Sequence, residues 1–150
     1  MEVYNYEHIV GFEETNLVGN VYYANYLLWQ GRCREMFLLE HAPQVLSELS
    51  RGLALVTTRV SCDFLLEALA FDRLLIEMRL GDLTQNRVTM RFDYWRVSED
   101  ARELIARGEQ QIASMRRLGE RMVPTPLPAP IRSAFARLDI RVSVLSGETR

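Results

Sequence analysis

The feature that most constrains the fold is a change in the spacing of apolar residues at Gly52. Before it, the run from Tyr22 to Glu40 contains no proline and a single glycine, and its length favours a helix over a strand. After it, apolar and polar residues alternate through several successive runs, which is typical of antiparallel strands in series. The sequence therefore predicts one long helix followed by an antiparallel sheet.

Shorter segments complete this order. Val3–Val10 is rich in β-forming residues and predicts a first strand. Asn20 is a candidate cap for the long helix, and Pro43–Gly52 predicts a second, shorter helix with proline at its start and glycine at its end. In the first alternating run, one face is predicted to carry Val56, Thr58, Val60, Cys62, Phe64 and Leu66, and the opposite face Thr57, Arg59, Ser61, Asp63 and Glu67. The inward residues of the next two runs are predicted to be Leu74, Ile76, Met78 and Leu80, then Val88, Met90, Phe92 and Tyr94.

The economical packing of these elements is an α+β fold in which the sheet wraps around the long helix. Residues 1–150 are expected to form one domain, because a chain of this length suits one hydrophobic core. A proline-rich linker is expected at 124–130, followed by a short terminal helix at 131–138 and a tail compatible with either a strand or disorder. Unpaired sheet edges favour pairing with a second copy of the chain, so a homo-oligomer is expected.

Composition excludes several classes of function. The net charge of −2 gives no electrostatic footprint for nucleic acid. We find neither a secretory signal nor an apolar run long enough to span a membrane, and the two cysteines, Cys33 and Cys62, fit a reduced, cytoplasmic chain better than a disulfide framework. His8 and His41 are isolated, and we expect no metal and no cofactor.

A polar stripe runs along the predicted long helix. At about 100° per residue, one narrow face carries Tyr23, Leu27, Gln30, Arg34 and Phe37, and Tyr26 lies beside it. The spacing leaves two interpretations open. In one, Gln30 and Arg34 lie at an exposed edge, or Arg34 pairs with Glu13 or Glu14. In the other, the arginine belongs to a ligand site, because a cation taken out of water needs a partner or a task.

The segment N-L-V-G-N-V-Y-Y-A-N-Y, Asn16 to Tyr26, resembles a motif of the hot-dog-fold acyl thioesterases of the 4-hydroxybenzoyl-CoA thioesterase type. In that family a loop of the form D-x-x-G-x-V-x-Y-x-N-Y leads into a long central helix wrapped by an antiparallel sheet. The longer stretch GNVYYANYLLWQGRCREMFL is similar to thioesterases associated with enediyne polyketide synthases. The resemblance therefore implies a hot-dog fold and thioester hydrolysis.

The resemblance also implies roles for individual residues. The family's loop carboxylate falls on Asn16, as in the enediyne subgroup, and an amide is a poor base and nucleophile, so the implied mechanism is attack by water. Asn16, Tyr26 and Arg34 are the implied catalytic residues; the implied substrate-binding residues are Gly19, Tyr23, Leu27 and Gln30. Glu13 and Glu14 are expected to be exposed charges.

The implied substrate is a β-ketoacyl polyene held as a thioester on an acyl carrier protein in enediyne antibiotic biosynthesis. Its hydrolysis would be followed by decarboxylation to a methyl ketone. Two alternatives remain at this point: a general acyl-CoA thioesterase, and a non-catalytic acyl-binding protein on the same fold. The choice between a dimer and a homotetramer also stays open.

Overall fold

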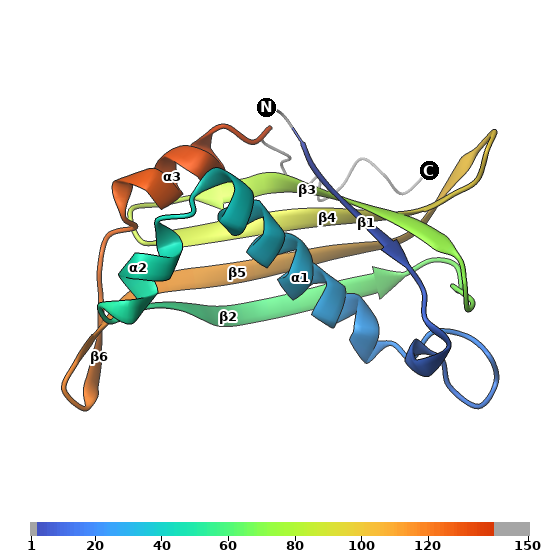
Figure 1. Cartoon of the computed structure of the whole chain (residues 1–150), viewed down its shortest axis with the longest axis horizontal. Coiled ribbons are helices and arrows are strands. Elements are labelled where there is room, and N and C mark those ends of the chain that lie inside the picture. Colours follow the sequence, from blue (N-terminus) through green and yellow to red (C-terminus); the bar gives the residue numbers. More distant parts are fainter. Residues whose placement is uncertain (1–2, 140–150) are drawn as a thin grey trace, which may run out of the picture.

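The structure is a computed structural model that describes residues 3–139, and it consists of a curled antiparallel sheet with helices packed against one face (Figure 1). In chain order the elements are β1 (Tyr4–Ile9), the short 3-10 helix η1 (Phe12–Glu14), α1 (Ala24–His41), α2 (Val45–Ser50), β2 (Leu53–Phe64), β3 (Arg73–Leu83), β4 (Arg87–Val97), β5 (Arg102–Leu118), β6 (Arg121–Pro124) and α3 (Ala129–Ala136). The long helix α1 lies across the sheet, which is the arrangement expected for the hot-dog fold. The predicted α+β class is confirmed.

The sheet follows the order β1-β3-β4-β5-β2, and β6 pairs with β5. All its pairings are antiparallel, and β1 and β2 form the two edges of this path. Residues 121–124, part of which was assigned to the proline-rich linker, instead form β6 in a hairpin with β5. Only Pro124 of the linker expected at 124–130 lies in this strand, and proline is tolerated at the end of an edge strand.

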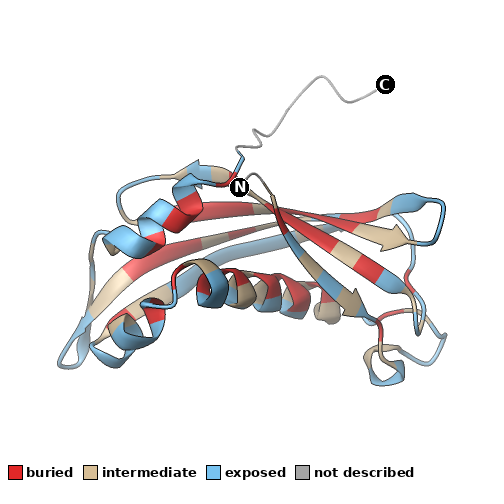
Figure 2. Cartoon of the chain, turned by 45° about the horizontal axis from the view of Figure 1, so that its top comes forward, coloured by how far each residue is buried: buried red, intermediate tan, exposed pale blue. Residues whose placement is uncertain are grey.

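The hydrophobic core lies between α1 and the central strands (Figure 2). All eight residues predicted to point inward from β3 and β4 are at most 4% exposed. On α1, Cys33 and Phe37 are fully buried, while Arg32 and Glu35 on the other side are exposed. The alternation of β3 and β4 therefore gives the predicted inward face, because successive side chains of a strand point to opposite sides.

The prediction of which β2 side chains face inward is partly wrong. A shift of register between Thr57 and Arg59 inserts a bulge, so the strand changes its alternation there. Thr57, predicted to face outward, lies within hydrogen-bond distance of Arg34 on α1, whereas the Thr58 hydroxyl bonds to Gln111. Beyond the bulge Phe64 does face the helix, since its ring packs edge-on against Tyr26 at 5.0 Å.

The start of α1 also differs from the prediction. The helix begins at Ala24. Tyr23 occupies the N-cap position, and no side chain forms a capping hydrogen bond there. Asn20 does not act as the cap, because its Nδ2 donates to Glu67 Oε1 at 3.2 Å and its backbone forms a bridge with Leu69. The terminal helix is present as α3, and the tail from 140 onward lies outside the described residues.

A buried hydroxyl fastens α1 to the sheet. Tyr94 on β4 is fully buried and donates from its hydroxyl to the carbonyl oxygen of Tyr26 at 2.8 Å. We expect Tyr94→Phe to lower the free energy of unfolding by about 1–2 kcal/mol, since a buried hydrogen bond is lost without creating a cavity. Urea unfolding would measure this difference, and an unchanged midpoint would contradict it.

Candidate active site

Arg34 projects from the middle of α1 toward the sheet rather than into solvent. Its Nη1 donates to Gln110 Oε1 at 2.7 Å and to Thr57 Oγ1 at 3.2 Å. Burial lowers its pKa, the carboxylate of Glu35 opposes this, and a guanidinium has so high a pKa that it stays charged near neutral pH. Its buried Nε has no hydrogen-bond partner among residues 3–139. Two hydrogen bonds thus fix the guanidinium of Arg34 in place, and its Nε–H is still free to donate.

Gln110 on β5 is the partner that sequence reasoning missed. It is 4% exposed, and its side chain reaches Arg34 from a position 76 residues further along the chain. Glutamine is neutral, so it fixes the direction of the guanidinium without neutralising its charge. A polar residue within the inward face of a strand was the available signal, but only the sheet register shows which helix residue it meets.

A groove of about 360 Å³ opens beside Arg34 between α1 and β2. Leu27 and Leu28 supply apolar walls from the helix, and Val60 supplies one from the strand. Its polar lining comes from Arg32, Arg34, Glu35, Thr57 and Gln110, and hydrogen bonds join Arg34 to Thr57 and Gln110. Apolar walls beside a few fixed polar groups are typical of small-molecule sites.

Tyr26 lies deeper, beside a second hollow of about 270 Å³ that Val21 and Phe64 also line. Burial, the largest cause, together with nearby Cys62 raises the pKa of Tyr26 to about 12. Its phenol is therefore a neutral group at physiological pH, suited to hydrogen bonding rather than to acting as a base. Gln30 is fully buried and donates from Nε2 to the Ser61 carbonyl oxygen at 2.9 Å, while its Oε1 has no hydrogen-bond partner among the described residues.

The other predicted site residues lie in the loop before α1. Asn16 is exposed, and its Oδ1 accepts a hydrogen bond from the backbone N–H of Val18 at 3.0 Å within its own loop. Gly19 adopts a φ of +93°, which explains a glycine at this turn. Tyr23 is 58% exposed at the start of the helix, with its ring against Tyr22. The structure thus brings Leu27 and Arg34 to one groove and leaves Asn16, Gly19 and Tyr23 at the helix entrance.

Glu14 contradicts the prediction that it is an exposed charge. Its side chain is only 16% exposed and accepts hydrogen bonds from Trp29 Nε1 at 2.7 Å and from the backbone N–H of Gly11 at 2.8 Å, and it contacts His8 Nε2 at 2.7 Å. The suggested pairing of Glu14 with Arg34 does not occur, because each is held by other residues. Glu13, next to it, is exposed as predicted.

The hydrogen bonds to Glu14 make stability depend on pH in a defined direction. Burial disfavours its charged form, but the bonds from Gly11, His8 and Trp29 outweigh burial and lower its pKa below the usual 4.5. A carboxyl whose pKa is lower in the folded state stabilises the fold above about pH 4.5 and loses that contribution as the pH falls further. We expect melting temperatures of the parent and Glu14→Gln to differ near pH 7 and to converge toward pH 3; a constant difference would contradict this.

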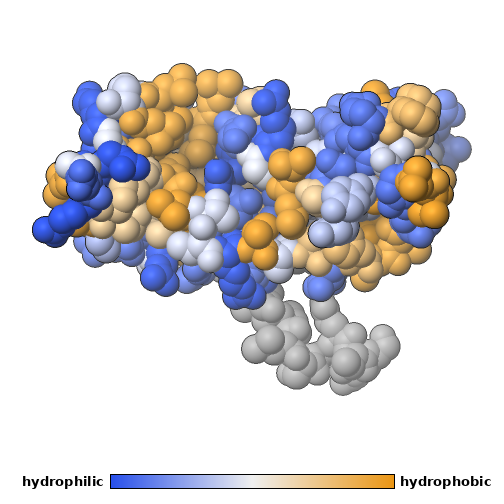
Figure 3. Space-filling view, turned by 90° about the horizontal axis from the view of Figure 1, so that it is seen from below, coloured by the Kyte–Doolittle hydropathy of each residue, from blue (hydrophilic) through white to orange (hydrophobic). Residues whose placement is uncertain are grey.

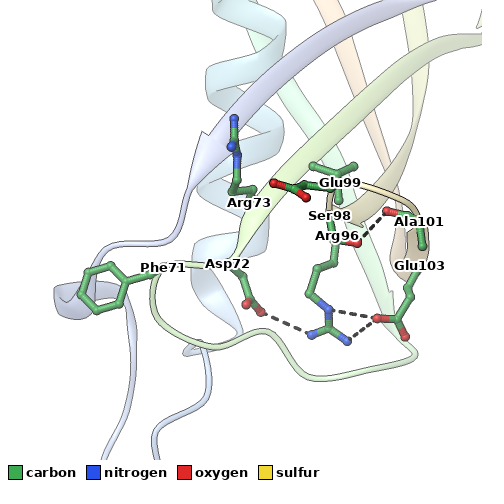
Figure 4. A pocket seen from close by; sticks show the side chains of 9 residues that line it. Phe71, Asp72, Arg73, Arg96, Ser98, Glu99, Ala101 and Glu103 are labelled. Carbon is green, nitrogen blue, oxygen red and sulfur yellow. Dashed lines mark hydrogen bonds and ion pairs between the residues drawn. The ribbon is translucent and has the colours of Figure 1, made fainter.

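A larger hollow, about 630 Å³, lies where β3 begins and β4 ends (Figure 4). Its central cation, Arg96, bonds to the Glu67 carbonyl oxygen at 2.7 Å and pairs with Asp72 at 3.3 Å and Glu103 at 3.2 Å. Because all these acceptors belong to the protein, Arg96 ties the loop before β3 to the hairpin that follows β4. We therefore place the candidate site at the groove beside Arg34.

Within residues 3–139 there is no group of three or more side chains that could hold a metal ion. No helix in that part of the chain has both the length and the apolar character needed to cross a membrane.

Comparison with known proteins shows which family the chain resembles. Residues 10–136 match the family model described as the thioesterase-like superfamily. The crystal structure of the dynemicin thioesterase, determined in work on polyene binding, is 47% identical over 93% of this chain and 100% of that chain, with a TM-score of 0.88. The 1,4-dihydroxy-2-naphthoyl-CoA thioesterase from Synechocystis is 26% identical over 90% of this chain and 96% of that chain, with a TM-score of 0.78.

A 4-hydroxybenzoyl-CoA thioesterase from Pseudomonas shares the fold, with 18% identity, a TM-score of 0.75, and coverage of 89% of this chain and 99% of that chain. No curated protein sequence matches the chain. The family match spans most of the sequence, and the implied hot-dog thioesterase resemblance is confirmed. This chain belongs to the thioesterase-like superfamily and is a thioester hydrolase.

Proposed function

We propose that this thioesterase releases a β-ketoacyl polyene from an acyl carrier protein in the biosynthesis of an enediyne antibiotic. The observation that carries the proposal is Arg34, a partly buried cation whose buried Nε donor is free, in a groove with apolar walls. The chain also has Asn16 where the wider family has a carboxylate. The 47% identity to a dynemicin thioesterase studied with a polyene supports the substrate class. A long apolar acyl chain suits walls made by leucine and valine.

The chemistry requires no carboxylate nucleophile. Water would attack the thioester carbonyl carbon, the C–S bond would break, and the thiolate of the carrier would take up the proton that the water loses. Arg34 would stabilise negative charge on the carbonyl oxygen. The unpaired backbone N–H groups at the start of α1 near Tyr23 lie about 15 Å from Arg34 along the same helix, so they could reach that oxygen only from the other protomer of the homo-oligomer proposed below. A thioester is already activated, so positioning and charge stabilisation suffice for a slow enzyme.

The other predicted residues would position the substrate. Asn16 would orient the water or the thioester, and Tyr26 would hold the β-keto oxygen. Gly19 would allow the loop to turn close to the substrate, while Leu27 and Gln30 would contact the acyl chain and its polar groups. The released β-keto acid would lose carbon dioxide to give a methyl ketone, a step that needs no further residue.

We propose that the enzyme works as a homo-oligomer, a dimer or a tetramer, in the cytoplasm. The edge strand β2 carries the partly exposed apolar residues Val56, Val60 and Phe64. Figure 3 views the molecule from the side on which β2 lies in Figure 1, and hydrophobic areas there alternate with hydrophilic ones. A second copy along this edge would cover these residues and enclose the groove, because the groove includes Val60.

Paired substrates test the proposal. The enzyme is incubated with a β-ketoacyl group on an acyl carrier protein and, separately, on coenzyme A, while thiol and methyl ketone release are followed. The proposal predicts faster release from the carrier protein. Preference for simple acyl-CoA substrates would instead favour a general acyl-CoA thioesterase. The 26% identity to the 1,4-dihydroxy-2-naphthoyl-CoA thioesterase makes this the second candidate.

A further inference from the structure

The carboxylate of Glu14 joins three separate parts of the chain. Its Oε1 contacts His8 Nε2 on β1 at 2.7 Å and accepts from the N–H of Gly11 at 2.8 Å, while its Oε2 accepts from Trp29 Nε1 on α1 at 2.7 Å. The rings of His8 and Trp29 also pack together with centroids 4.8 Å apart. One side chain therefore fixes η1 both to the edge strand and to the central helix.

The backbone of Glu14 closes the loop that follows. Its carbonyl oxygen accepts hydrogen bonds from the N–H of Tyr22 at 2.9 Å and from Asn25 Nδ2 at 2.8 Å. Inside this closure Thr15 bridges to Val21, and the N–H of Asn16 donates to the carbonyl oxygen of Asn20 at 2.9 Å. The loop between Glu14 and Tyr22 thus has both ends fastened at one residue, with Asn16 two positions from it.

We propose that Glu14 is a positioning residue that holds the Asn16 loop in register with the N-terminal end of α1. The inference rests on the proposed function of Asn16 and goes beyond it, because the loop tip itself has few contacts. Leu17 and Val18 are almost fully exposed, and within residues 3–139 the Asn16 side chain bonds only to the N–H of Val18. The placement of Asn16 relative to the helix entrance is therefore set at the base of the loop.

The chemistry of the contact requires a carboxylate. Three donors converge on its two oxygens, and each bond from a donor to an ionised acceptor is stronger than a neutral one. A glutamine at this position keeps one acceptor oxygen but turns an NH₂ group toward one of the donors. Glu14→Gln is thus nearly isosteric, yet it must give up at least one of the contacts to Gly11, His8 or Trp29.

Two measurements test the proposal on the full-length protein. Amide hydrogen exchange at Asn16 and Tyr22 reports whether the loop is held, and kcat and KM for a β-ketoacyl thioester report its consequence. The variants are Glu14→Gln, Trp29→Phe, which removes one donor and keeps an aromatic ring, and the matched control Glu13→Gln. Glu13 has the same charge, lies in the same 3-10 helix and is exposed.

We expect Glu14→Gln to speed exchange at both amides by roughly tenfold or more, and to lower kcat by roughly tenfold to a hundredfold with little change in KM. Glu13→Gln should match the parent in both. In an Asn16→Ala background, Glu14→Gln should lower kcat by less than about twofold, because its effect passes through Asn16. A general loss of structure would instead lower kcat by the same factor in both backgrounds.

The outcomes separate this inference from the proposed function. Unchanged exchange in Glu14→Gln, or an equal loss of kcat with and without Asn16, overturns the positioning role while leaving the thioesterase proposal intact. A parent protein without activity on any β-ketoacyl thioester defeats the proposed function, and the exchange data then decide the role of Glu14 alone. If Glu14→Gln does not fold, the exchange rates and the loss of kcat with and without Asn16 are measured for Trp29→Phe, and the same outcomes decide.

Discussion

Replacing Arg34 by alanine is expected to lower kcat/KM for a β-ketoacyl thioester by roughly 10²- to 10³-fold, the usual cost of losing one donor to a developing oxyanion. The guanidinium is held by Gln110 and Thr57 before substrate arrives, so it need not reorganise during the reaction. Thiol release under steady-state conditions measures the effect. Most of the loss should fall on kcat, because the charge that Arg34 stabilises develops in the transition state.

Two further variants make this result specific. Arg137→Ala removes an exposed arginine at the end of α3 and should leave kcat/KM unchanged. Gln110→Leu keeps the side-chain volume but frees the guanidinium, and we expect an intermediate loss of roughly tenfold from misplacement of Arg34. Activity of Arg34→Ala within a factor of about two of the parent would remove the basis of the proposed mechanism.

Gly108→Ala is expected to lower the free energy of unfolding by about 1–3 kcal/mol, the cost of overpacking a core. A Cβ at Gly108 on β5 would overlap Gln30 Nε2 and lie 3.1 Å from the Ser61 carbonyl oxygen. These two groups are hydrogen-bonded to each other, so Gln30 cannot move away from the added Cβ without disturbing that bond. Chemical unfolding of the parent and the variant measures the change.

The same measurement on two other variants identifies the cause. Gly31→Ala adds a Cβ that meets no atom within 4 Å on a helix, so it should not destabilise the protein and is expected to stabilise it by up to about 1 kcal/mol. In a Gln30→Ala background the nearest obstacle is gone, and the cost of Gly108→Ala should shrink. An equal cost in both backgrounds would mean that the clash with Gln30 is not its source.

The helix and the sheet could be predicted because their signals are local. Tyr22–Glu40 has the length of a helix, and the alternation in β3 and β4 sets their inward faces without reference to any other segment. The alternation in β2 gave the wrong face for Thr57, because a single bulged residue reverses the face to which all preceding side chains of the strand point. No pattern in the letters TTR marks that bulge.

The candidate site was predictable only in part for the same reason. Arg34 stood out as a cation on a buried stripe, but its partners Thr57 and Gln110 come from two strands whose register is a property of the whole sheet. Glu14 gave no signal, because an acidic residue in a short loop is usually exposed. Its burial follows from His8 and Trp29 approaching from different elements.

The sequence by itself determined the order of elements, the apolar faces of β3 and β4, and the thioesterase family, since periodicity and the Asn16–Tyr26 motif are readable along the chain. Only the tertiary structure decided which polar groups meet: Gln110 with Arg34, and Glu14 with Trp29. The physical reason is that a hydrogen bond requires donor and acceptor, on segments far apart in sequence, to be placed to within a few tenths of an ångström. Strand register and helix packing together set this placement, and neither can be predicted from a local sequence pattern.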